Sequence, residues 1–202
     1  MYAFGRIALL FVMVWFVVGC LSDDGDQPSI ILPSVAEAVE FDTSGMDDFE
    51  IVMTVLTHPR CINCHPSGDR PHQTDEQTVH LFNVQRGDND HGGDVQQCQT
   101  CHHEENNPYS LVPGAPHWGL APASMGWMGL SHAEIAESLL DLSKNGNRTH
   151  DDLLEHMAND ALVLWGWEPG ADRTPIPVSH DVFVDALSSW LEAGAVIPAG
   201  TQ

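Results

Sequence analysis

Two five-residue segments, Cys61-Ile62-Asn63-Cys64-His65 and Cys98-Gln99-Thr100-Cys101-His102, share one pattern. Each reads C-x-x-C-H, the attachment signature of a c-type haem, in which two thiols add to the porphyrin vinyl groups and the histidine binds the iron. Four of the five cysteines of the chain fall in these segments, here called the first and the second motif. The sequence therefore predicts two covalent haems c. The predicted attachment residues are Cys61, Cys64, Cys98 and Cys101, and the predicted proximal ligands are His65 and His102.

Zinc binding and disulfide formation are the alternative uses of these four cysteines. The 33 residues between the two pairs exceed the usual spacing of a zinc ribbon. Disulfides or redox-active pairs suit an exported protein. Neither alternative requires a histidine directly after the second cysteine of both pairs, so the pattern favours haem attachment over both.

The fifth cysteine, Cys20, follows an apolar N-terminal segment. Arg6 precedes an apolar run from Ile7 to Val18, which is the pattern of an export signal. Val17-Val18-Gly19-Cys20 is similar to the lipobox of bacterial lipoproteins, in which the signal is cut before the cysteine and the thiol is lipidated. An uncleaved signal anchor is the alternative. Both interpretations predict an exported chain, anchored to a membrane on the periplasmic or cell-surface side.

The composition is strongly acidic. The chain has 29 acidic and seven basic residues and a formal net charge of −22. This balance argues against nucleic acid as a partner, because nucleic-acid binding needs clustered Lys and Arg. Such a surface attracts basic proteins, although adaptation for solubility explains the charge equally well. We expect redox partners with basic docking surfaces.

The pattern of the chain predicts a mainly α fold with long irregular loops. Helical periodicity covers residues 46–57, and capping residues predict three further helices that open at Ser131, Thr149 and Ser179. Residues 66–97 are rich in Gly and Pro and carry no convincing strand pattern. A loop of this length is unusual unless something else supplies its core.

We therefore expect a cytochrome c-like domain whose core is organised around the two covalent haems. The predicted organisation is a lipoprotein signal peptide at 1–20, a flexible tether at 21–45 and a dihaem domain at 46–202. The tether prediction rests on its Asp, Ser, Pro and Gly content.

Four side chains are favoured as distal iron ligands: His80, His91, His117 and Met125. The first two lie between the motifs and can reach either haem. His117 follows a turn made of proline and glycine, which would fix its direction, and Met125 lies in a loop. His103 directly follows a proximal ligand and cannot reach over the same haem.

The twelve histidines of the chain exceed what proximal ligation needs. Met53 and Met157 fall on apolar helix faces, where core packing is the better interpretation. The sequence therefore favours histidine on both sides of one or both irons. Such ligation gives lower potentials than a methionine–histidine pair.

Further stretches between residues 55 and 197 carry a resemblance to a known family. They are His58-Pro59-Arg60, Val84-Gln85-Arg86-Gly87, His91-Gly92, Pro113-Gly114-Ala115-Pro116-His117-Trp118, Ser124-Met125, Glu155-His156-Met157 and Trp165-Gly166-Trp167. With the two motifs, they resemble small bacterial dihaem cytochromes that are often labelled "isoquinoline 1-oxidoreductase subunit". The resemblance implies a molybdenum hydroxylase as an electron donor, and it favours His91 and His117 as distal ligands. The chain itself has no iron–sulfur pattern of the C-x4-C-x2-C type.

These features together predict an electron-transfer protein. We expect a dihaem c-type cytochrome that passes electrons between redox partners at the cell envelope. Two alternatives stay open. One is a small dihaem peroxidase-like oxidoreductase, which needs an open or displaceable distal site beside acid–base groups. The other is a cytochrome subunit of a molybdenum hydroxylase.

Overall fold

The structure, a computed structural model, describes residues 41–170 and 173–199. These residues all belong to one unit, Val39–Gln202. The predicted signal peptide at 1–20, the lipidation site Cys20 and most of the predicted tether at 21–45 lie outside the described residues. Over the two described ranges, no helix is long and apolar enough to cross a membrane.

Each of the four longest helices begins at a side chain that caps its first turn. These helices are α1 (Asp48–Leu56), α3 (His132–Leu140), α4 (His150–Asn159) and α6 (His180–Glu192). Their N-caps are, in the same order, Asp47, Ser131, Thr149 and Ser179. The first three complete a capping box with an acidic side chain at the third helical position, which satisfies backbone N–H groups at both ends of the box. All four predicted helices are confirmed.

Two one-turn helices were not predicted. Helical periodicity was expected over residues 46–57, and α1 ends at Leu56; Pro59 then opens α2 (Pro59–Ile62), where its missing N–H costs nothing. Asp160 caps α5 (Ala161–Leu164). Four residues are too few to show a helical period in the sequence.

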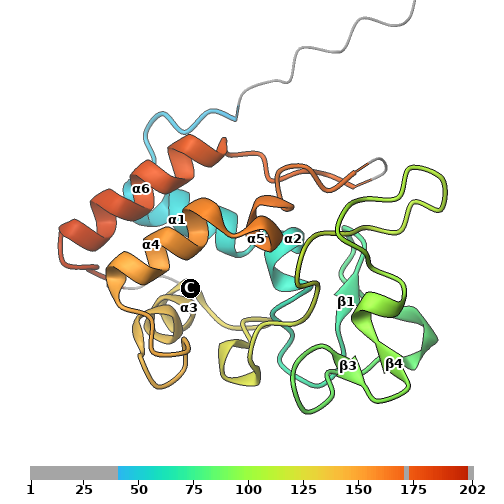
Figure 1. The fold of residues 1–202 in the computed structure, drawn as a ribbon. Helices are drawn as coiled ribbons and strands as arrows, with labels where there is room; N and C mark the ends of the chain where they lie inside the picture. The colour runs from blue at the N-terminus through green and yellow to red at the C-terminus, as the bar shows by residue number, and fades with distance from the viewer. Residues whose placement is uncertain (1–40, 171–172, 200–202) are drawn as a thin grey trace, which may run out of the picture. The chain divides into compact units, whose positions relative to one another are not determined.

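The apolar core lies among the four longest helices. α1 and α6 lie side by side, and α4 packs against α6 (Figure 1). The rings of Phe49 and Trp190 meet edge to face between α1 and α6, with centroids 5.7 Å apart. Met53 and Met157 are buried in this core, as their helical positions predicted.

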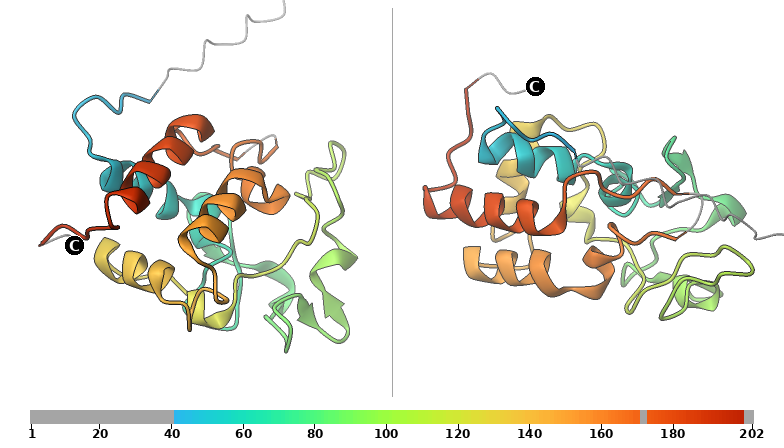
Figure 2. Two further views of the ribbon diagram at one scale, coloured as in Figure 1. Left: turned by 60° about the vertical axis from the view of Figure 1, so that its left-hand side comes forward. Right: turned by 90° about the horizontal axis from the view of Figure 1, so that it is seen from above.

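The remaining secondary structure is short. β1 (His72–Gln73) pairs antiparallel with β2 (Thr78–Val79), and β3 (Gly92–Gly93) pairs antiparallel with β4 (Gln96–Gln97). Three 3-10 turns are η1 (Leu81–Asn83), η2 (Cys98–Thr100) and η3 (Ala123–Met125). Helices make up 37% of the structure and strands 5%, which confirms a mainly helical fold. Figure 2 shows β1–β4 gathered at one side of the helices.

A buried guanidinium organises the long loop between the motifs. Arg86 donates to the carboxylate of Asp90 at 2.6 Å, to the carbonyl of Ala121 and to the carbonyl of Gly68 at 3.3 Å. The next residue, Gly87, has φ +69°, and a Cβ there would lie 2.0 Å from the carbonyl oxygen of Gly92. A buried charge and a close backbone approach thus replace regular structure in this loop.

We expect Phe183→Ala to lower the free energy of unfolding by about 3–5 kcal/mol, because it removes a fully buried ring from the core. Urea unfolding followed by far-UV circular dichroism measures the loss. Ser189→Ala, on the exposed side of α6, is the control and should change stability by less than about 0.5 kcal/mol. Equal effects of the two substitutions would contradict the described packing of α6.

Candidate haem-attachment sites

The first motif runs from α2 into the turn that follows it. The backbone N–H of His65 donates to the carbonyls of Cys61 and Ile62, which keeps the motif in a helical turn. A distant segment, residues 119–128, runs along this turn. Within it, the N–H of Ala121 donates to the Cys64 carbonyl at 3.0 Å, and the N–H of Trp127 donates to the His65 carbonyl at 2.9 Å.

The imidazole of His65 is held by two contacts. Its Nδ1 lies 2.7 Å from the carbonyl oxygen of Met125, and its ring stacks on the Trp127 indole with centroids 3.6 Å apart and planes 12° apart. Burial lowers the pKa of His65 to about 4, so the ring is neutral at physiological pH. Because Nδ1 donates its proton to the carbonyl, Nε2 is left as a metal ligand.

The second motif repeats this arrangement with different partners. Nδ1 of His102 lies 2.8 Å from the Pro113 carbonyl oxygen, and the ring stacks on Trp118 with centroids 4.6 Å apart and planes 5° apart. Burial also lowers the pKa of His102. A carbonyl on one nitrogen and an orienting ring are the surroundings expected of a metal-binding histidine, whose other nitrogen holds the metal.

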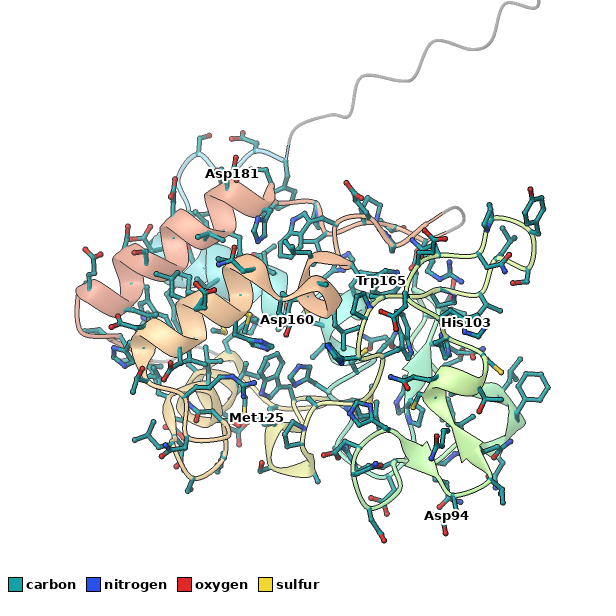
Figure 3. All side chains as sticks on the ribbon, viewed as in Figure 1. Asp94, His103, Met125, Asp160, Trp165 and Asp181 are labelled. Atoms are coloured by element: carbon teal, nitrogen blue, oxygen red, sulfur yellow. The ribbon has the colours of Figure 1, made fainter. Side chains whose placement is uncertain are left out.

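A cavity of about 280 Å³ adjoins the first motif. Cys61, Cys64 and His65 form part of its wall, and much of the rest is apolar and comes from η3, α4 and α5. Figure 3 labels three of the wall residues from these elements and the turns beside them: Met125, Asp160 and Trp165. An apolar wall facing two thiols and an imidazole suits the flat face of a porphyrin.

The cysteines of both motifs are free thiols in the structure. Burial raises the pKa of Cys61 to about 12 and that of Cys64 to about 11. Burial likewise raises the pKa of Cys98, whereas Cys101 is exposed. The thiols of Cys61 and Cys64 are therefore neutral at physiological pH. Over residues 41–170 and 173–199, no three His, Cys, Asp or Glu side chains gather as a metal-ion site.

The second motif lies in a part of the chain that contributes no residue to the main apolar core. No residue between Asn63 and Gly114 belongs to that core. Large apolar side chains in the same part of the chain are exposed instead: Val79, Leu81, Phe82, Val95, Tyr109 and Leu111. This part of the chain therefore leaves large apolar side chains in contact with solvent instead of burying them in the core.

The two motifs are close in space. The neighbouring Cys98 adds to the effect of burial in raising the pKa of Cys64, so the two thiols lie within electrostatic range. Aromatic rings also join the sites. Trp165 of the cavity wall meets Trp118 edge to face, with centroids 4.8 Å apart, and Trp118 stacks on His102.

Of the three histidines predicted as distal ligands, His80 has its ring beside the ring of a predicted proximal ligand, His102. The centroids of His80 and His102 are 6.0 Å apart, with planes at 68°. Nδ1 of His80 lies 2.8 Å from the Leu81 carbonyl oxygen, which again leaves Nε2 as the available nitrogen.

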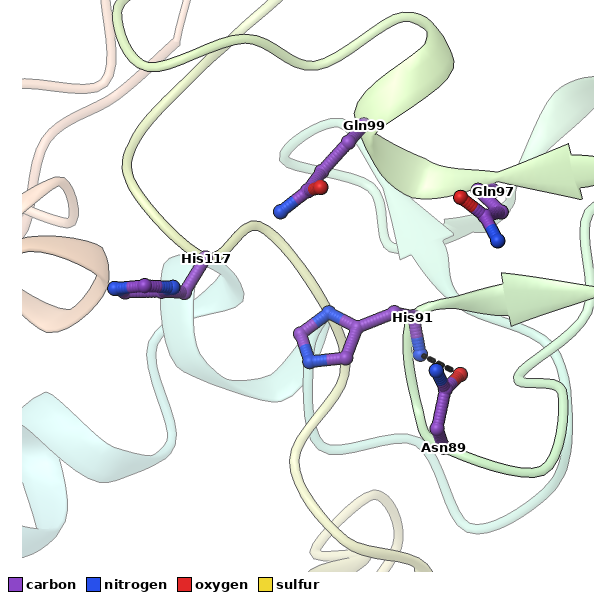
Figure 4. Close-up of a pocket in the computed structure, with 5 residues that line it drawn as sticks. All are labelled: Asn89, His91, Gln97, Gln99 and His117. Carbon is purple, nitrogen blue, oxygen red and sulfur yellow. Dashed lines mark hydrogen bonds between the residues drawn. The ribbon is translucent and has the colours of Figure 1, made fainter.

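The predicted pair His91 and His117 lines a smaller pocket (Figure 4). Nδ1 of His91 lies 3.1 Å from the Trp118 carbonyl oxygen. His117 is exposed, has φ +59°, and its ring points away from His91. It also reaches the cavity beside the first motif.

Met125, the fourth predicted distal ligand, is buried, and it supplies the carbonyl that holds His65. Its sulfur accepts a hydrogen bond from the Ser138 hydroxyl at 3.6 Å. These contacts place Met125 beside the proximal imidazole and describe a packing role for it.

His156 of α4 belongs to one of the stretches that carry the family resemblance but was not among the four favoured distal ligands, and it lines the cavity beside the first motif. Its Nδ1 lies 3.3 Å from Oδ2 of Asp160. His156 lies on α4 and Asp160, four residues later, caps the end of that helix, so their spacing in the sequence was a usable signal.

No family model, curated protein or solved structure matches the chain.

Arg60, directly before the first motif, brings a buried positive charge to the cavity wall. Its guanidinium pairs with Asp75 and lies 6.0 Å from the centre of the Trp165 ring. Asp75 in turn accepts hydrogen bonds from the hydroxyl of Thr174 at 2.6 Å and from its backbone N–H at 3.2 Å. The hydrogen bond from the Thr174 hydroxyl, together with the Arg60 charge, holds the pKa of Asp75 below its usual range.

We expect Asp75→Asn to lower the free energy of unfolding by about 1–3 kcal/mol at neutral pH, since a buried guanidinium loses its anionic partner. The loss should stay below that of a fully buried pair because the Asp75 side chain is 36% exposed. A carboxylate with a lowered folded pKa stabilises the fold above its unfolded pKa, near pH 4, and this stabilisation is lost as the pH falls through the folded pKa.

The difference in stability between wild type and Asp75→Asn should therefore shrink below about pH 4. Urea unfolding over a pH series measures it. Asp94→Asn, which alters an exposed carboxylate, is the matched control and should leave the pH dependence unchanged. A difference that stays constant to low pH would contradict the role assigned to the Arg60–Asp75 pair.

Proposed function

We propose that this protein is a dihaem c-type cytochrome that transfers electrons between redox partners. The observation that supports this most is the repeated arrangement at the two C-x-x-C-H motifs. At each motif, Nδ1 of the imidazole donates a hydrogen bond to a backbone carbonyl, and the ring stacks on a tryptophan. The two cysteines of each motif are free thiols. The two carbonyls, of Met125 and Pro113, come from different positions of the segment between the second motif and α3, and a shared ligand role explains the repetition better than packing does.

The residues of the two motifs fit the proposed cofactors. Cys61 and Cys64 would hold one haem and Cys98 and Cys101 the other, with His65 and His102 on the irons. A bound haem supplies one-electron oxidation and reduction. The chain would tune the redox potential of each haem in two ways. The hydrogen bonds to the carbonyls would strengthen the imidazoles as electron donors to the iron, and the stacked indoles would limit the access of water. In this proposal the domain is cytochrome c-like, and the haems provide the apolar core that the loops lack.

We propose His80 as the distal ligand of the second haem. An iron held between two imidazoles through Nε2 requires ring centres about 6 Å apart, because metal–nitrogen bonds are about 2 Å long and Nε2 lies about 1 Å from the ring centre. The spacing between His80 and His102 is 6.0 Å. A histidine on each side closes both axial positions, which favours an electron carrier over a peroxidase-like enzyme at this site.

The close approach of the two motifs supports electron passage within one chain. Cys64 and Cys98 lie within electrostatic range of each other, and Trp165 and Trp118 bridge the two sites. Haems held at the two motifs would be neighbours, which would allow an electron to pass from one to the other.

The proposed partners rest on the net charge of the chain, and the proposed location rests on its N-terminal segment. A net charge of −22 favours redox partners with basic docking surfaces. The molybdenum hydroxylase implied by the family resemblance would be one such donor. The export signal and the lipidated Cys20 would keep the protein at the cell envelope, where c-type haems are attached.

The proposal is tested by counting haems on protein matured with a cytochrome c assembly system. We expect pyridine haemochrome absorbance and intact mass to give two haems per chain. The double variant Cys98→Ala/Cys101→Ala should keep one haem, because the first motif is untouched. Cys20→Ala, a cysteine outside both motifs, is the control and should keep two. Fewer than two haems on the wild-type chain would refute the proposal.

The His80 assignment is tested by the spin state and potential of the haems. We expect His80→Ala to convert one of the two haems from low spin to high spin. His80→Met should instead keep both haems low spin and raise the midpoint potential of one of them. Absorption spectroscopy and spectroelectrochemistry measure these changes. His103→Ala, an exposed histidine beside the second motif, should leave both haems unaltered. Two low-spin haems in His80→Ala would rule out His80 as a ligand.

A further inference from the structure

We infer that His156 on α4 is the distal iron ligand of the first haem and that Asp160 positions its ring. This inference rests on the proposed function and deepens it, because it names the distal ligand of the first haem.

His156 shares a cavity with the first motif. The cavity wall includes Cys61, Cys64 and His65 from the motif and His156 from α4, about ninety residues later in the chain. A distal ligand must come from a separate segment, and α4 provides one on a regular helix.

The orientation of His156 leaves the required nitrogen available. Nδ1 lies 3.3 Å from Oδ2 of Asp160, so Nε2 remains as the ligand atom. The Asp160 carboxylate is itself fixed, because its Oδ1 accepts from the backbone N–H of Leu162 at 2.9 Å and from that of Val163 at 3.4 Å. One oxygen caps α5 while the other holds the imidazole. A carboxylate on the outer nitrogen of a metal-binding histidine orients the ring and strengthens it as a donor.

The rival ligands in the same cavity are less well placed. His117 is exposed, and within the described ranges no hydrogen bond orients its ring. Met125 contacts the proximal imidazole through its carbonyl, and its sulfur accepts from Ser138. Met157 is buried in the helical core. Of these side chains, His156 is the one with a neighbour that would prepare it for a metal.

The assignment gives both haems histidine on each side of the iron. Neither iron would then have a free position for oxygen, peroxide or another small ligand, and both potentials would lie in the low range. The first haem would be held on its distal side by α4, whereas the second would be held by the loop that carries His80.

The test compares the wild-type full holoprotein with two variants by electron paramagnetic resonance and near-infrared magnetic circular dichroism. Wild type should show bis-histidine signals from two haems. His156→Ala should lose the bis-histidine signal of one haem while the haem count stays at two. His117→Ala, a histidine lining the same cavity, is the matched control and should keep both signals. Two bis-histidine haems in His156→Ala, or loss of one in His117→Ala, would overturn the inference.

Two further variants keep the inference testable if His156→Ala does not accumulate. His156→Met should give one methionine–histidine haem with a raised potential, and an unchanged bis-histidine spectrum would overturn the assignment. Asp160→Asn should keep both haems low spin and raise the potential of one, since the imidazole loses a carboxylate partner. Asp181→Asn, with the same change in charge on α6, should not. Equal potentials in these two variants would overturn the positioning role of Asp160.

Failure of this inference is distinct from failure of the proposed function. Fewer than two haems on the wild-type chain would refute the proposed function. Two haems, with an unchanged bis-histidine spectrum in His156→Met, would remove only the His156 assignment.

Discussion

The hydrogen bond from the imidazole of each motif, His65 or His102, to a backbone carbonyl is the constraint on which the rest of the structure depends. A C-x-x-C-H motif fixes where the histidine stands in the chain but not which way its ring faces. The carbonyls of Met125 and Pro113 fix the direction, and Trp127 and Trp118 fix the plane. All four of these residues belong to the irregular segment between the second motif and α3. That segment therefore has a structural purpose although it contains little regular structure.

The two sites are built on different principles. The first lies against the helical core, where η3, α4 and α5 supply a ready apolar wall. The second lies among short hairpins and turns that a buried Arg86 and close backbone contacts hold in place. Apolar side chains such as Phe82 and Val95 are exposed there, and a porphyrin would give them a surface to pack on. We expect the second site to be the more exposed one and the natural point of exchange with partner proteins.

Much of this arrangement was predictable because it is local. Side-chain caps at Ser131, Thr149 and Ser179 marked the starts of three helices correctly. The partners of the proximal histidines were not predictable, because a carbonyl has no signature in the sequence and Met125 is 60 residues from His65. His156 was not among the favoured distal ligands for a related reason. A histidine on an amphipathic helix looks like a surface residue until the cavity that it faces is known.

The account is tested most directly by a crystal structure of the matured protein with anomalous diffraction at the iron absorption edge. It predicts two iron peaks per chain, one beside Nε2 of His65 and one beside Nε2 of His102, each within a porphyrin bonded to its two cysteines. An absence of iron, a single peak, or one metal ion shared by the four cysteine sulfurs would contradict it.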